Sequence, residues 1–413
     1  IWTGMGAVAL IRLLSRYLQG PKAWLAGSLV TLAVPLQMAG QNWDDHDRSG
    51  RTLCRDMGAN FRNSLQREGH PVLFVMGDND TFPVWYGGEV EGIRPDVRAC
   101  NLMYLSGGVY AAQMRLPVRE APPLPFTLPE QFCQDGILDF VRVNPSILVP
   151  GADGQPREVS LKTQIEAIYR QNPEKKPFGE DPFEWKNIVR YWLTSDDPAM
   201  RCIPTDEIHI PVDRETVARS GIPVPPGTTV PDTMVIRLKD RSHLIRTGLL
   251  LIDLIAGSQW ERPLYMTITS GLNEYIDLSE HLIQEGLAYR IVPYEVKPTD
   301  LGMDLDRTYD CVMNRFEYGG LDNPDIYLDE TNRNMGALLQ NLQIVLAMEL
   351  YRDGQTERAR KVLEKSQETI RCRELNNDDR HAQAQIAHLY RLIEQQENGK
   401  KEKEQNKRKE TKI

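Results

Sequence analysis

An uncharged, largely apolar run extends from Ala23 to Trp43. As a helix its 21 residues would span roughly 30 Å, which is the thickness of the hydrocarbon core of a bilayer. Trp24 and Trp43 lie at its two ends, where aromatic side chains favour the membrane interface. The run therefore predicts a transmembrane helix over about 23–43, whereas Gln37 and Gln41 keep open the alternative of a buried hairpin in a soluble domain.

A second apolar stretch, IWTGMGAVALI, precedes this run, and the chain starts at Ile1 without a Met or a charged leader region. We expect residues 1–43 to be the end of a longer membrane region. The connector between the two stretches holds Arg12, Arg16 and Lys22 and no acid, so the positive-inside tendency places it in the cytoplasm. The residues after Trp43 are then expected on the extracytoplasmic side.

Residues 44–330 show the alternation of helix and strand that is typical of an α/β domain. Apolar residues recur every fourth position over 53–65, which predicts a helix that stops before Gly69. Short apolar runs at 72–76 and 96–105 predict buried strands, and residues 84–93 can form a helix between them. Because this order forms a β-α-β unit, we expect a soluble α/β domain with a parallel-rich sheet.

A second β-α-β unit is predicted from strands at 233–238 and 263–269 and a helix at 244–260. Residues 288–296 can add one more strand. The segment 117–233 is rich in proline and has only short periodic pieces, so we expect it to be an irregular insertion on the surface.

From about residue 331 the pattern is helical alone. The spacing of Leu346, Ala347, Leu350, Gly354 and Leu363 matches the large and small positions of a tetratricopeptide-like helical hairpin. Because one such repeat does not form a stable solenoid, we expect the all-α region 331–396 to pack on the α/β domain. The charged tail 397–413 has no apolar periodicity and is predicted to be disordered.

A first polar cluster, the linker cluster, lies where the chain leaves the predicted membrane helix and comprises Asp44, Asp45, His46, Asp47 and Arg48. Carboxylates and an imidazole can bind a divalent cation, and the cluster can also contact a phosphate-bearing lipid head group at the membrane surface. A solvated loop held by local salt bridges is the equally weighted alternative. We treat these residues as candidates for substrate binding.

A second polar cluster, the strand-end cluster, follows the predicted strand at 72–76 and comprises Asp78, Asn79, Asp80, Thr81, Trp85 and Tyr86. Open α/β sheets bind ligands beyond the carboxyl ends of their strands, which is where this cluster is expected. Helix capping would explain one or two of these polar residues. Capping does not require several polar groups followed by two aromatic ones, so a substrate site is the competing interpretation.

Charge and motifs exclude several classes of function. The net charge of −9 and the pI near 5.5 argue against a nucleic-acid partner, which requires a dense basic face. The six cysteines lack C-x-x-C spacing, which argues against a zinc site, although their even number permits disulfides outside the cytoplasm. The chain has no G-x-S-x-G, Walker or G-x-G-x-x-G motif, so a serine hydrolase, a nucleoside triphosphatase and a dinucleotide-binding protein have no support. No cofactor is certain, and a divalent cation is the one that the residues would allow.

A metal-dependent phosphoesterase is a further alternative, because its paired metals need carboxylates and histidines such as those of the two clusters. The Gly-Asn-His and Gly-His-x-His elements that would complete such a site do not occur in the chain. We keep this hypothesis behind the others for lack of ligands.

Five segments in order carry a resemblance to a known family: GQNWDDHDRSGR (40–51), GDNDTFPVWYGGEVEGIRPDVRACN (77–101), RPLYMTIT (262–269), EGLAYRIVP (285–293) and YLDETNR (327–333). The chain resembles the bacterial membrane family catalogued as domain of unknown function 2723, from about residue 24 to 395. That family is similar to glycosyltransferase family 117 and to vertebrate protein O-mannosyltransferases with a tetratricopeptide C-terminus.

The resemblance implies a GT-C membrane glycosyltransferase of the bacterial inner membrane, with its C-terminal domain in the periplasm. Its reaction would transfer a sugar, mannose, from a polyprenyl-phosphate donor to Ser or Thr of a secreted acceptor protein. The catalytic Asp or Glu of such enzymes, which acts as the base, lies in an early extracytoplasmic loop. That loop is upstream of this sequence, so no catalytic residue is assigned. This part would recognise the acceptor or its glycan, and a non-catalytic protein-binding module is the alternative.

Overall fold

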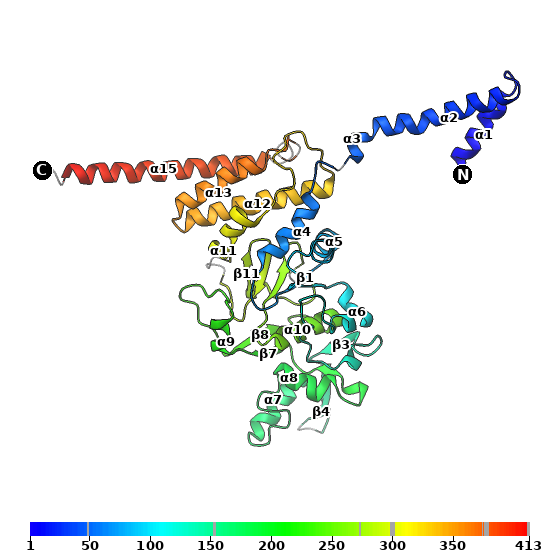
Figure 1. Cartoon of the computed structure of the whole chain (residues 1–413). Helices are drawn as coiled ribbons and strands as arrows, with labels where there is room; N and C mark the ends of the chain where they lie inside the picture. Colours follow the sequence, from blue (N-terminus) through cyan, green and yellow to red (C-terminus); the bar gives the residue numbers. More distant parts are fainter. Residues whose placement is uncertain are drawn as a thin grey trace.

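The computed structural model of the chain describes residues 1–47, 49–151, 154–271, 274–297, 302–373, 375 and 380–410, and for residues 44, 45, 397 and 399–410 it describes the backbone alone. An N-terminal pair of apolar helices precedes an α/β body, and a helical region follows that body (Figure 1).

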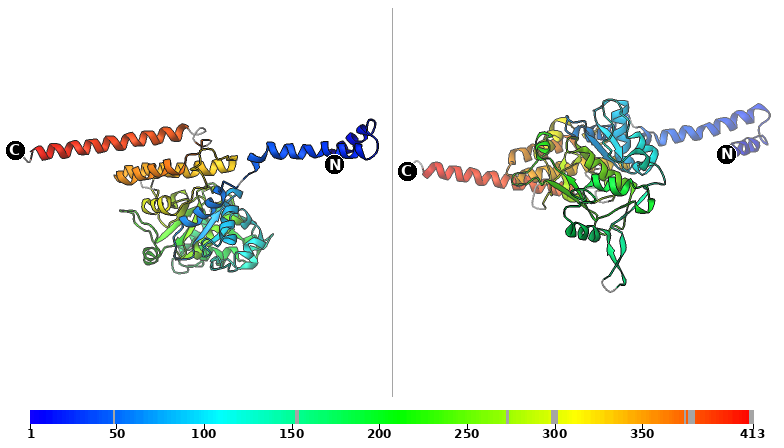
Figure 2. Two further views of the ribbon diagram at one scale, coloured as in Figure 1. Left: turned by 45° about the horizontal axis from the view of Figure 1, so that its top comes forward. Right: turned by 90° about the horizontal axis from the view of Figure 1, so that it is seen from below.

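The two N-terminal helices, α1 (Trp2–Leu14) and α2 (Pro21–Gln41), project away from the body (Figures 1 and 2). Leu25 and Leu36 of α2 are 64% and 65% exposed, so this helix leaves its apolar side chains uncovered. Among the described residues, α2 is the one helix that is long and apolar enough to cross a membrane. It begins two residues before the predicted boundary because Pro21 is well suited to the first turn of a helix. The helix suggests association with a membrane.

The α/β body is built on a five-stranded sheet in the order β11-β12-β10-β1-β2. Its strands are β1 (Val72–Val75), β2 (Arg98–Asn101), β10 (Leu264–Thr267), β11 (Leu282–Glu285) and β12 (Ala288–Ile291). The three strands β10, β1 and β2 run parallel, whereas β12 and β11 add an antiparallel hairpin. The sheet is therefore mixed, and the prediction of a parallel-rich sheet is correct for three strands only. Gly286, with φ of 61°, permits the tight turn of the hairpin.

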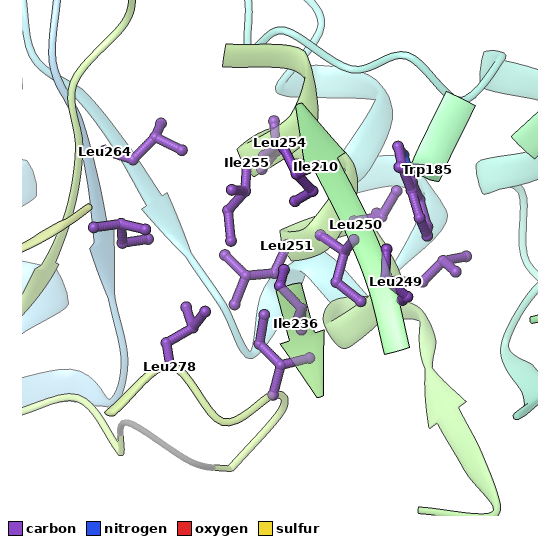
Figure 3. Packing of buried hydrophobic residues seen from close by; sticks show 14 of the residues in the cluster. Trp185, Ile210, Ile236, Leu249, Leu250, Leu251, Leu254, Ile255, Leu264 and Leu278 are labelled. Carbon is purple, nitrogen blue, oxygen red and sulfur yellow. The ribbon is translucent and has the colours of Figure 1, made fainter. Parts of the chain in front are cut away.

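Both faces of this sheet are buried. Leu73 and Val75 share a core with α4 (Leu53–Ser64) and the C-terminal helices, whereas Val72 and Phe74 pack in the core that contains α10 (Arg246–Ser258). This alternation follows from the two-residue period of a strand. Figure 3 shows the second core, in which leucines of α10 lie among side chains from β7, β8 and α8.

The first predicted β-α-β unit is confirmed. Helix α5 (Asp78–Trp85) and the π-helical turn η1 (Tyr86–Val90) connect β1 to β2, so the helix starts at Asp78 and not at residue 84. The second predicted unit is wrong, because β8 (Thr233–Arg237) pairs antiparallel with β7 (Glu207–Pro211) outside the main sheet. The residue pattern of β8 identified a strand but carried no information on its partner.

The Pro-rich insertion is more regular than predicted. Its further elements are η3 (Glu130–Cys133), β3 (Phe140–Val143), β4 (Ser146–Pro150), β5 (Pro156–Ser160), α7 (Leu161–Gln171), α8 (Trp185–Ile188), η4 (Val189–Leu193), η5 (Pro198–Met200), β6 (Cys202–Ile203) and α9 (Arg214–Arg219). Two short helices, η2 (Tyr104–Ser106) and α6 (Gly108–Gln113), precede the insertion, and β9 (His243–Ile245) follows it. Buried Asp253 of α10 accepts hydrogen bonds from Thr127 N at 2.9 Å and from Trp185 Nε1 at 2.8 Å. The insertion is therefore anchored in the core and does not only cover the surface.

The C-terminal region is helical, as predicted. Helices η6 (Ser279–His281), α11 (Leu305–Asp310) and η7 (Cys311–Arg315) precede α12 (Glu330–Arg352), α13 (Thr356–Thr369) and α15 (Arg380–Glu410). Helix α12 contacts α13 and α4, which confirms that the hairpin packs on the α/β body. The tetratricopeptide-like assignment stays a prediction. Helix α15 continues through 397–410, where disorder was expected, because Glu, Lys and Gln are good helix formers.

Candidate functional site at the carboxyl edge of the sheet

The carboxyl ends of β2, β1 and β10 meet at one edge of the sheet. The chain continues from β1 to β2, which pairs with one edge of β1. Strand β10, which comes later in the chain, pairs with the opposite edge of β1. Ligands of open α/β sheets bind at such a reversal of connection. The strand-end cluster, residues 78–86, follows β1 directly and therefore lies at the predicted place.

Asp80 is the buried centre of this edge and is 1% exposed. Its Oδ2 accepts hydrogen bonds from Thr267 Oγ1 at 2.5 Å, from Thr269 Oγ1 at 3.1 Å and from Met76 N at 3.0 Å. Burial raises the pKa of the Asp80 carboxyl, although these hydrogen bonds act in the opposite direction. Asp80 thus joins the ends of β1 and β10 and positions the start of α5.

Thr81 links the same helix to β2. Asn101 Nδ2 donates to Thr81 Oγ1 at 2.8 Å, and Asn101 Oδ1 accepts from Tyr104 N at 3.0 Å. Both Thr81 and Asn101 are buried. Asn101, Tyr104, Thr267 and Thr269 were not among the predicted site residues. Ligands of open α/β sheets bind beyond the carboxyl ends of the strands. These four residues follow or end β2 and β10, so the same rule predicts them when it is applied to these strands as well as to β1.

The remaining members of the strand-end cluster face solvent. Asp78 and Asn79 are exposed in the first turn of α5, Trp85 is half-buried and Tyr86 is exposed at the other end of the helix. The φ of 86° at Gly77 turns the chain sharply from β1 into α5, a conformation that favours glycine. The cluster therefore divides into a buried half that fixes the helix and an exposed half that is free to bind.

A row of aromatic rings continues from the exposed half of the cluster. Phe82 contacts Trp85 with ring centroids 6.1 Å apart, Trp85 lies 6.1 Å from Tyr104, and Tyr104 lies 5.8 Å from Tyr110. Phe82 and Tyr104 are 51% and 43% exposed. We call these four residues the aromatic row. Asp78 lies four residues before Phe82 in α5, so both side chains are on the same face of this helix.

The linker cluster has a different environment. His46 ends the short helix α3 (Trp43–His46), and its Nδ1 lies 2.9 Å from Asn42 O. Asp47 is exposed and accepts hydrogen bonds from Ser49 N at 2.9 Å and Ser49 Oγ at 2.6 Å. These two hydrogen bonds lower the pKa of Asp47. Both groups are engaged locally, while the side chains of Asp44 and Asp45 and all of Arg48 lie outside the described part of the structure.

The possible metal ligands do not form a cation site in the described ranges. Within them, no three His, Cys, Asp or Glu side chains are close enough together to hold a metal ion. Asp80 already accepts hydrogen bonds from two hydroxyls and a backbone amide. We therefore derive no chemistry through a divalent cation. All six cysteines are described and none forms a disulfide.

These features define an α/β domain that follows an apolar helix and has a candidate binding edge at the carboxyl ends of its parallel strands. The chain belongs to the family described as TMEM260-associated domain 2, whose model matches residues 54–309. This match includes the sheet, the insertion and the strand-end cluster, but not the linker cluster. The comparisons with curated proteins and with solved structures found no significant match. The family description agrees with the membrane association that α2 suggests.

Proposed function

We propose that residues 44–396 recognise the acceptor or its glycan for a membrane glycosyltransferase. The whole enzyme would transfer a sugar, mannose, from a polyprenyl-phosphate donor to Ser or Thr of secreted proteins, on the periplasmic side of a bacterial inner membrane. The observation that carries the proposal is the exposed aromatic row beside Asp78 and Asn79. The match to a family of domains associated with a membrane protein supports the association with a membrane.

The aromatic row suits a sugar or a sugar-bearing peptide. The faces of Phe82, Trp85 and Tyr104 offer apolar area for the C–H groups of a pyranose, at little cost in side-chain entropy. Asp78 accepts hydrogen bonds from hydroxyl groups, and the amide of Asn79 both donates and accepts them. Apolar area with a few placed polar groups is the usual composition of a ligand site.

The buried half of the cluster keeps this surface in place. Asp80 and Thr81 connect α5 to β10 and β2, so the exposed residues of α5 and Tyr104 are held on a rigid edge of the sheet. A fixed surface lowers the entropic cost of binding. In this proposal the catalytic base belongs to the membrane region, and residues 78–86 orient the acceptor hydroxyl toward it.

The test is the glycosylation of a secreted acceptor in cells that carry the full-length protein. We expect Phe82→Ala with Tyr104→Ala to reduce acceptor O-glycosylation about tenfold, because two exposed rings that each contribute roughly 0.7 kcal/mol to binding together supply about 1.4 kcal/mol. The measurement is site occupancy by mass spectrometry at equal protein level. Phe140→Ala is the matched control, since Phe140 is an exposed ring of β3, 72% exposed, and its ring contact is with His243 and not with a member of the row. Unchanged occupancy in the double variant would contradict the proposal.

A protein-binding module is the second candidate. Apolar side chains are exposed around α6, next to the aromatic row, with Met103, Val109 and Leu116 at 50%, 73% and 60% exposure. Such a surface favours a protein partner. The two candidates differ in their ligand, because only a recognition site for glycan should bind a mannosylated peptide more tightly than the same peptide without its sugar.

A further inference from the structure

A pocket of about 440 Å³ opens at the free edge of β2, beside the aromatic row. Side chains from α4, η1 and β2 and the residues around α6 line it, and Trp85 and Tyr110 of the row form part of its wall. Much of the lining is apolar, including Val97, Met114 and Val118. Three arginines, Arg62, Arg98 and Arg119, complete it. A pocket of this size accepts a small organic molecule.

Arg98 is buried in the pocket wall and forms no ion pair with a carboxylate of the described residues. The residue is 4% exposed, its Nη2 donates to Gln113 O at 3.1 Å, and its Nε has no hydrogen-bond partner in the same part of the chain. Burial lowers the pKa of the Arg98 guanidinium. The Arg98 guanidinium, which has five N–H donors, therefore has hydrogen-bonding capacity that the described residues do not use.

Arg62 is the second buried cation and is 2% exposed. It donates from Nε to Val84 O at 2.8 Å and from Nη1 to Arg94 O at 2.8 Å, so these partners are backbone carbonyls without net charge. Burial lowers its pKa to about 10. Gly88 lies against the guanidinium, since a Cβ atom there would come within 1.9 Å of Nη2. The charge of Arg62 is therefore held in position by the fold without an ion pair among the described residues.

The acidic side chain of the lining, Glu89, favours the charged forms of Arg62 and Arg98 from a distance, but it pairs directly with a third arginine. Glu89 is exposed and forms an ion pair with Arg119 at the pocket rim, with Oε2 3.2 Å from Nε. With Glu89 and Arg119 balancing one another, the charges of Arg62 and Arg98 remain. A lining of this kind attracts an anion and has room for an apolar body.

We propose that this pocket binds an organic anion in which a carboxylate or a phosphate is attached to an apolar body. The head group accepts hydrogen bonds from Arg98, close to Arg62, and the body packs against Trp85 and the apolar wall. This proposal does not depend on the proposed function.

The test is calorimetric binding to the full chain in lipid nanodiscs, with empty nanodiscs as the blank. The probes are 2-naphthoate, 2-naphthyl phosphate and the neutral 2-naphthalenemethanol. At least one anion should bind about tenfold more tightly than the alcohol, and the tighter of the two anions identifies the head group. The proposal is overturned by equal affinity of the alcohol, or by the absence of binding of both anions at about 1 mM.

Variants assign the binding to this pocket. Arg98→Met should weaken binding of the preferred anion about tenfold. Arg142→Met is the matched control, because Arg142 of β3 likewise donates from Nη2 to a backbone carbonyl, that of Ala199, at 2.7 Å. Val118→Trp fills the pocket from its rim and keeps both buried arginines, so it decides the question if Arg98→Met does not fold. Wild-type affinity in Val118→Trp would place the binding elsewhere.

Discussion

The linker cluster and the strand-end cluster have similar residues but different environments. Each contains several short acidic or amide side chains. In the linker, the hydrogen bonds of Asp47 and His46 in the described residues are to near neighbours in the sequence, and both side chains are exposed. After β1, Asp80 is buried and bonds to residues from a strand almost two hundred positions later in the chain. A polar residue becomes part of a built site when the fold brings distant donors to it.

The family match agrees with this division. The matched residues 54–309 include the strand-end cluster and leave out residues 44–48. From their residues alone, the two clusters are equally good binding candidates. The structure supports the second as a surface with a fixed geometry. For the first, it shows only local hydrogen bonds in the part that it describes.

The largest difference between the clusters should appear in stability. Asp80→Ala leaves three donors at the strand ends without their acceptor, so the free energy of unfolding should fall by about 2–4 kcal/mol. Asp47→Ala removes only exposed local bonds and should change the unfolding midpoint much less than Asp80→Ala does. Urea unfolding of both variants measures this. Equal midpoints for the two variants would contradict the difference between the two clusters.

A smaller difference should appear in the pH dependence of stability. Burial raises the pKa of Asp80, so the folded protein keeps a proton that the unfolded chain has lost. The stability that Asp80 contributes is full below its unfolded pKa of about 3.9, and it is lost as pH rises through the folded pKa. The free energy of unfolding of the wild type relative to Asp80→Asn should therefore fall as pH rises above about 4.

Asp47 should give the opposite sign. Hydrogen bonds from Ser49 lower its pKa, so its contribution is present above the unfolded pKa and is lost as pH falls through the folded one. Relative to Asp47→Asn, the wild type should lose stability toward acid. Denaturation curves at a series of pH values measure both slopes, and slopes of the same sign would contradict the assignment of the two environments.

Local patterns predicted much of the fold. The four-residue period of α4, the short apolar run of β1 and the boundaries of α10 and β10 all corresponded to elements of the structure. These features depend on residues near one another in the sequence. The pairing of β8 with β7 and the anchoring of the insertion through Asp253 depend on distant partners, which periodicity does not specify.

The sequence predicted the location of the site but not all of the residues that form it. The position after a buried strand located residues 78–86 correctly at the carboxyl edge. Its partners Asn101 and Thr267 come from other strands, so their proximity to Asp80 and Thr81 required the sheet order. Nothing in the sequence identified Arg62 and Arg98 as buried pocket residues, because an arginine in a helix or strand is usually on the surface.

Binding of a mannosylated Thr peptide to the full chain in nanodiscs, measured by calorimetry, tests the central claim most directly. Phe82→Ala with Tyr104→Ala should weaken the affinity about tenfold, whereas His46→Ala with Asp47→Ala should leave it within about twofold of the wild type. The proposed role of the aromatic row is contradicted if the aromatic variant binds as the wild type does, or if the linker variant loses as much affinity as the aromatic one.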